Sequence, residues 1–104
     1  MKVAIASEGE DKNAQVSAVS GRAPFYLIYE GKKLVKTIKN PFRMGGGGAG
    51  FGVAQMLANE GVELVISGKF GPNMQSMLDS KHVKTKIVTG KTVKEALESV
   101  YAKT

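Results

Sequence analysis

The C-terminal half of the chain alternates short apolar segments with helical segments, and this order limits the folds open to it. The apolar, β-branched run at 63–67 predicts a buried strand, and Pro72 then suits the first position of a helix. A further strand is expected at 84–89, and Thr92 with Glu95 matches a capping box that begins the last helix. Strands joined through a helix run parallel with a right-handed crossover, so two neighbouring parallel strands are predicted.

The N-terminal half predicts antiparallel pairing instead. Strands are expected at 2–7, 25–30 and 33–39, and the Gly31-Lys32 turn joins the last two as a hairpin. Partial alternation in the third segment suits an edge strand with two distinct faces. One face would carry Leu34, Lys36 and Ile38, and the other would carry Val35, Thr37 and Lys39.

The remaining helix sets the strand order. It is expected at 50–60 and ends at Gly61, so the element order is β-β-β-α-β-α-β-α. The strand at 2–7 is the other strongly apolar strand, so it is placed beside 63–67 in the centre, giving the order 3-2-1-4-5. We expect one α/β domain over residues 1–104 with a mixed five-stranded sheet.

Composition excludes several classes of site. The 104 residues include no cysteine and one histidine, which rules out disulfides, thiolate-held clusters and a zinc site of His and Cys. His82 is expected in a solvated loop between a helix and a strand. No apolar run approaches the roughly 20 residues of a membrane span, and the N-terminus lacks a secretory pattern. We therefore expect a cytoplasmic protein.

The net charge of +6 comes from lysines that are scattered along the chain. Lys32, Lys33, Lys36 and Lys39 form the densest group, and they either protect a strand edge or form a basic patch. No aromatic residues are interleaved with them in the pattern of single-strand binders, so nucleic acid is not favoured.

The carboxyl edge of the sheet is the expected ligand site, because ligands of parallel α/β sheets collect there. Three connections should converge at that edge, namely 8–23, 68–73 and 89–91, and the glycine run at 45–50 can reach the same rim. Glycine allows backbone amides to approach a ligand closely, and helix N-termini favour anions. The run lacks the ending of a P-loop, so it reads either as a flexible linker or as a ligand-contacting loop.

Two cationic side chains strengthen the anion interpretation. Lys69 lies just before Gly71-Pro72, and Arg22 offers a planar fork for an acid or a phosphate. In the alternative interpretation Pro72 only initiates a helix, and Arg22 forms a surface ion pair with Glu8, Glu10 or Asp11.

No catalytic pattern supports an enzyme. Strands 2–7 and 63–67 end in Ser7 and Ser67, where a two-metal nuclease would need carboxylates. The chain also lacks a Ser-His-Asp order and a GxSxG elbow. We expect a binding protein and not an enzyme.

Several segments taken in order resemble one known family. They are the opening MKVAIAS, Ser17 with Gly21-Arg22-Ala23-Pro24 before FYLIYE, Asn40-Pro41, the glycines at 46–50, ELVISGKFGPNMQSML and the helix from Thr92. Over nearly its whole length the chain is similar to the dinitrogenase iron–molybdenum cofactor biosynthesis family, which includes small nitrogenase cofactor carriers.

This resemblance implies an RNase H-like three-layer α/β/α fold and a non-enzymatic carrier of an iron–sulfur cluster or an iron–molybdenum cofactor precursor. The site residues expected to bind it are Ser17, Gly21, Arg22, Gly46, Gly47, Gly48, Lys69, Gly71, Pro72 and Asn73. The family often reads Ser-x-His-Phe-Gly-Arg, whereas this chain has Val19 and Ser20 at the histidine and phenylalanine positions. Charge and amide groups would then hold an anionic cluster.

Three functions remain open from the sequence. The first is the metallocluster carrier, and the second is a binding module for another small anion or a phosphorylated metabolite at the same rim. The third is a regulatory protein whose basic face meets an acidic partner, with a homodimer as one form of it.

Overall fold

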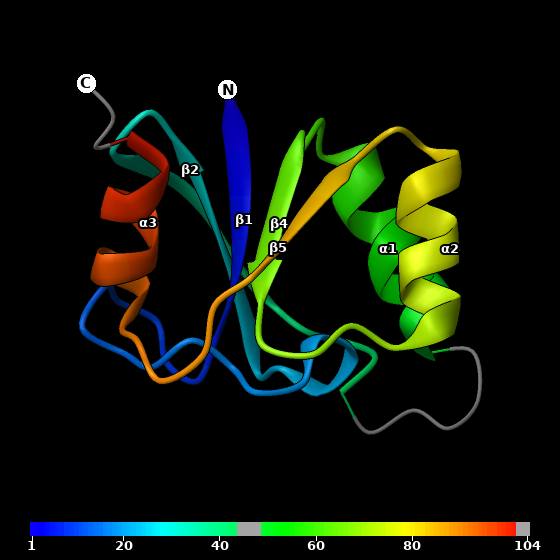
Figure 1. Ribbon diagram of the computed structural model, residues 1–104, viewed down its shortest axis with the longest axis horizontal. Coiled ribbons are helices and arrows are strands. Elements are labelled where there is room, and N and C mark those ends of the chain that lie inside the picture. Colours follow the sequence, from blue (N-terminus) through cyan, green and yellow to red (C-terminus); the bar gives the residue numbers. More distant parts are fainter. Residues whose placement is uncertain (44–48, 102–104) are drawn as a thin grey trace.

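The computed structural model describes residues 1–43 and 49–101, where a five-stranded sheet carries helices on both faces (Figure 1). The strands are β1 (Lys2–Ser7), β2 (Phe25–Glu30), β3 (Lys33–Lys39), β4 (Leu64–Ser67) and β5 (Lys84–Ile87). The helices are α1 (Ala49–Asn59), α2 (Pro72–Ser80) and α3 (Val93–Tyr101), with a short 3-10 helix η1 at Ser20–Arg22.

The strand order is β3-β2-β1-β4-β5, as the sequence predicts. β1 pairs antiparallel with β2 and parallel with β4, and β4 pairs parallel with β5. The carboxyl ends of β1, β4 and β5 therefore meet at one edge, and this edge is called the carboxyl edge below.

Two apolar layers hold the helices to the sheet. Residues Ala4 and Ala6 of β1 lie in the layer beneath α1 and α2, and Val3 and Ile5 lie in the layer beneath α3. All four side chains are fully buried. A strand covered on both faces has no solvent side, which explains why β1 is apolar without a break.

β3 departs from the predicted alternation. A register shift lies opposite Ile28 and Tyr29, so that Leu34 pairs with Tyr29 and Thr37 pairs with Leu27. Because Leu27 and Tyr29 share one face of β2, Leu34 shares a face with Thr37, and the expected grouping of Leu34 with Lys36 is wrong.

The helix boundaries follow local chemistry. Gly61 has a φ of +79°, which suits a glycine after the end of α1. The Thr92 backbone N–H donates to Glu95 Oε1 at 2.8 Å, and the Glu95 backbone N–H donates to Thr92 Oγ1 at 3.2 Å, which confirms the capping box of α3. None of the helices in residues 1–43 and 49–101 has the length and apolar character needed to cross a bilayer.

Candidate functional site

The loop after β1 crosses the carboxyl edge and pairs with the segment that follows β4. The Gly68 N–H donates to Ser17 O at 2.8 Å, and the Lys69 N–H donates to Ala18 O at 2.6 Å. The Ser20 N–H then donates back to Lys69 O at 2.8 Å. The Val16 N–H donates to Lys91 O at 2.9 Å, so backbone hydrogen bonds join all three connections that the sequence places at this edge. Residues 17–20 with 68–69 are called the edge pairing below.

Gly68 makes the edge pairing possible, and sequence reasoning did not single it out. A carbon at the Cβ position of Gly68 would lie 2.3 Å from Ala18 O, a backbone atom that cannot rotate away. The requirement for glycine arises from a segment about fifty positions earlier in the chain. A local motif gives no signal for it.

The start of α1 and the start of α2 lie side by side next to η1. A carbon at the Cβ position of Gly50 would lie 3.2 Å from Met74 N, and one at Gly21 would lie 3.9 Å from Gly50 Cα. Figure 1 shows η1 and the first turn of α2 at the same edge of the sheet. The turn that carries Arg22 therefore adjoins the N-termini of two helices.

The N-terminus of α2 has an open approach. Its N-cap is Gly71, which supplies no side-chain cap hydrogen bond, and Pro72 follows in the first turn. Among residues 1–43 and 49–101, no heavy atom lies within 4 Å of the Cβ position of Gly71, apart from its chain neighbours. The first amides of a helix have no partner within it, and Asn73 is exposed, so its N–H can donate to an anion placed beside Gly71.

Arg22 and Lys69 are both exposed at this edge. Within the described ranges the single ion pair joins Lys36 to Glu60, at 2.7 Å. Arg22 therefore does not pair with any of the acidic residues that the alternative interpretation proposed for it. Its guanidinium group is available to a ligand.

Ser17 occupies a different kind of position. Its side chain is buried, and its hydroxyl donates to Glu8 Oε2 at 2.7 Å. Ser17 also supplies the carbonyl that accepts from Gly68. The geometry thus favours a role in building the edge pairing over direct contact with a ligand.

Two buried polar side chains hold η1, and sequence reasoning missed both. The Tyr26 hydroxyl donates to Ser20 O and lies 2.9 Å from Ser20 Oγ. Burial raises the pKa of Tyr26, although the hydrogen bond with Ser20 acts in the opposite direction. On the far side of the turn, Asn40 Nδ2 donates to Ala23 O at 2.9 Å and to Gly21 O at 3.2 Å.

Gly46, Gly47 and Gly48 lie outside the described residues, so the structure neither places them at the edge nor separates them from it. The rest of the predicted set is divided. Gly21, Arg22, Lys69, Gly71, Pro72 and Asn73 belong to segments that meet around η1 and the start of α2.

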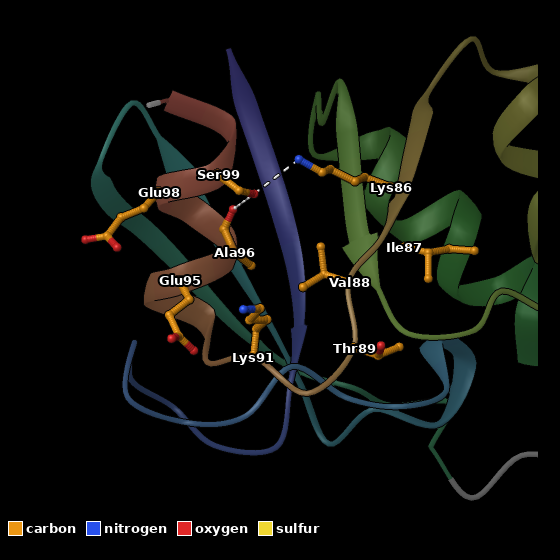
Figure 2. Close-up of a pocket in the computed structure, with 9 residues that line it drawn as sticks. All are labelled: Lys86, Ile87, Val88, Thr89, Lys91, Glu95, Ala96, Glu98 and Ser99. Atoms are coloured by element: carbon orange, nitrogen blue, oxygen red, sulfur yellow. Dashed lines mark hydrogen bonds between the residues drawn. The ribbon is translucent and has the colours of Figure 1, made fainter. Parts of the chain in front are cut away.

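Two open cavities of about 480 Å³ each lie elsewhere. The first is a groove between the end of β5 and α3, where Lys86 Nζ donates to Ser99 Oγ at 3.1 Å and the Val88 side chain lies between the two elements (Figure 2). The second lies between Phe42 and the outer side of α1. Neither is lined by a predicted site residue, so neither of these two hollows is the candidate site.

The family model for the dinitrogenase iron–molybdenum cofactor matches residues 1–103. The chain belongs to the dinitrogenase iron–molybdenum cofactor family. A search of curated protein sequences gave no match.

Solved structures agree with this family fold. A Thermotoga protein described as a NifB protein of the DUF35 family is 31% identical, with 96% of this chain and 86% of that chain covered and a TM-score of 0.81. The apo form of the orange protein from Desulfovibrio gigas is 24% identical, with the same coverage and a TM-score of 0.90. A protein described as a dinitrogenase from Methanocaldococcus jannaschii is 16% identical, again with the same coverage and a TM-score of 0.67.

The side chains of this family member do not fit direct coordination of iron. The chain has no cysteine, and no three His, Asp or Glu side chains gather around a possible metal position in the described ranges. His82 precedes β5 and so lies at the opposite edge of the sheet. Val19, at the position where the family often has histidine, is 44% exposed beside Lys69 and offers no donor atom.

Proposed function

We propose that this protein is a non-enzymatic carrier of an iron–sulfur cluster of the iron–molybdenum cofactor type, or of a precursor of one. Membership of the cofactor family supports the cargo class. The observation that carries the proposal is the open N-terminus of α2 beside exposed Arg22 and Lys69. Such a surface suits an anion that is received and released, and the proposed setting is the cytoplasm.

Binding in this proposal is by charge and hydrogen bonds and not by coordination. Arg22 supplies a planar fork of donors, Lys69 supplies a compact cation, and the Asn73 amide adds the positive end of α2. Gly71 leaves room for the anion to approach this amide. Because no protein atom bonds to the metal, the cargo keeps its own ligands.

Anaerobic reconstitution tests the cargo. The purified chain is mixed with a preformed iron–sulfur cluster without oxygen and passed over a gel-filtration column. Visible absorbance that comigrates with the protein is expected. Colour that always separates from the protein contradicts the carrier proposal.

Variants then test the site. Arg22→Ala and Lys69→Ala should each weaken retention about tenfold, because one charge-assisted hydrogen bond contributes roughly 1.5 kcal/mol. Lys84→Ala removes the same charge from the far edge of the sheet and is the matched control. Equal losses in all three variants would mean that net charge alone, and not this site, holds the cluster.

A small oxyanion or a phosphorylated metabolite is the second candidate cargo. The observation that favours it is the lack of cysteine together with the placement of His82 away from the carboxyl edge. A ligand that binds the native state raises the melting temperature, so phosphate, sulfate and nucleotides can be compared by thermal shift. A shift that needs Arg22 and Lys69, without cluster retention, would favour this candidate.

A further inference from the structure

Asn40 is a buried polar side chain whose hydrogen-bonding groups are aimed at the turn that carries Arg22. Its Nδ2 donates to Ala23 O at 2.9 Å and to Gly21 O at 3.2 Å, the carbonyls on either side of Arg22. Its Oδ1 accepts from the Phe42 N–H at 2.9 Å, and it is only 6% exposed. Because the buried amide of Asn40 is hydrogen-bonded through both Nδ2 and Oδ1, it fixes the turn relative to the end of β3.

Tyr26 holds the same turn from the core side. Its single hydroxyl proton goes to Ser20 O, so the Ser20 hydroxyl must donate to the Tyr26 oxygen, 2.9 Å away. The Tyr26 ring is fully buried in β2. Ser20 precedes Arg22 by two residues, so the turn is held before and after the guanidinium-bearing residue.

Apart from the bond from the Ser20 N–H to Lys69 O, the backbone of the turn has little to order it besides its own short 3-10 bonds. η1 has three residues, and its own backbone bonds are long, with Ala23 N to Ser20 O at 3.1 Å and Arg22 N to Val19 O at 3.3 Å. Short 3-10 segments have poor hydrogen-bond geometry. Ordering a long cationic side chain on a mobile turn lowers the affinity for a ligand.

We infer that Asn40, together with Tyr26, is a positioning residue that preorganises Arg22 for an anion at the carboxyl edge. The inference rests on the proposed function, since it assigns the device that orients one of its cationic groups. Asn40 itself does not touch the anion. Its effect on binding must therefore pass through Arg22.

A double-mutant cycle tests this route, with molybdate as the titrated oxyanion in isothermal titration calorimetry. Asn40→Ala should weaken binding about three- to tenfold in the wild-type chain, the cost of ordering one long side chain. In the Arg22→Ala background the same change should have no effect beyond about twofold. An equal loss in both backgrounds would assign Asn40 a merely structural role and overturn the inference.

Order in the free protein gives a readout that needs no ligand. The NMR order parameters of the Gly21, Arg22 and Ala23 amides should fall in Asn40→Ala from the rigid value of about 0.85 toward about 0.6. Val93→Ala, in the apolar layer beneath α3, is the control that lowers stability without reaching η1. Unchanged order parameters in Asn40→Ala would also overturn the inference.

If Asn40→Ala does not fold, Tyr26→Phe is the alternative variant for the same test. It removes one hydroxyl from the core side, and the same loss of order at 21–23 is expected. If wild type binds neither molybdate nor cluster, the proposed function fails and the order parameters still judge the positioning role. If Arg22→Ala weakens binding while neither Asn40→Ala nor Tyr26→Phe does, the positioning role alone fails.

Discussion

Gly68→Ala should be among the most damaging single-methyl changes in the chain. The added carbon would lie 2.3 Å from Ala18 O and 2.8 Å from both Ala18 C and Ala18 Cα. All three are backbone atoms, so no rotamer change relieves the overlap. The segment around Ala18 must move away from β4.

The magnitude follows from the hydrogen bonds that this movement breaks. The bonds from Gly68 N to Ser17 O, from Lys69 N to Ala18 O and from Ser20 N to Lys69 O span 2.6–2.8 Å. At about 1 kcal/mol each, their loss lowers the free energy of unfolding by about 3 kcal/mol. This is a large part of the roughly 5–15 kcal/mol that stabilises a small domain.

Urea unfolding followed by circular dichroism measures this loss. Gly71→Ala is the matched control, because its Cβ position is open and its φ of −70° suits alanine. It should change stability by less than about 1 kcal/mol, because the reduced freedom of the unfolded chain is stabilising while alanine is a poorer N-cap residue than glycine. A Gly68→Ala loss below about 1 kcal/mol with an unchanged denaturant slope would refute the reasoning.

Three smaller predictions concern charge and pH. The Thr92 backbone N–H lowers the pKa of Glu95, so the contribution of Glu95 to stability is present above about pH 4.3 and is lost as the pH falls further. Glu95→Gln should therefore flatten the acid part of a plot of unfolding free energy against pH. Burial raises the pKa of Tyr26, so its contribution to stability is fully present below about pH 10 and declines above it. Tyr26→Phe should reduce this decline when unfolding is measured at alkaline pH. Lys36→Met breaks the surface pair with Glu60 and should cost less than about 1 kcal/mol in urea unfolding, whereas a larger loss would mean that the pair acts as a buried one.

Most of the fold was predictable because its signals are local. The apolar strands, the Gly31 hairpin and the capping box at Thr92 lie within a few residues of the features they determine, and the structure confirms each. The boundaries moved slightly: β4 begins at Leu64, and β5 ends at Ile87, two residues before the expected end. The face predicted for Leu34 was wrong because an alternating sequence pattern does not reveal a β-bulge.

The candidate site was less predictable because its architecture is nonlocal. The sequence identified Arg22, Lys69 and the start of α2 from charge and from turn residues. It did not reveal that Gly68 lies against Ala18, or that Asn40 and Tyr26 hold η1, since each depends on carbonyl groups elsewhere in the chain. Asn40 looked like a strand end before proline, and only the folded chain shows where its amide donates.

The edge pairing has a consequence for folding. The first connection of the chain, near Ser17, can be completed only after β4 and residues 68–69 have been placed beside it. Contacts between such distant segments form late, after the loop between them has closed. A folding intermediate that contains only β1, β2 and β3 would thus have no binding site for an anion. Binding of the cargo would therefore show that the whole chain has reached its native arrangement.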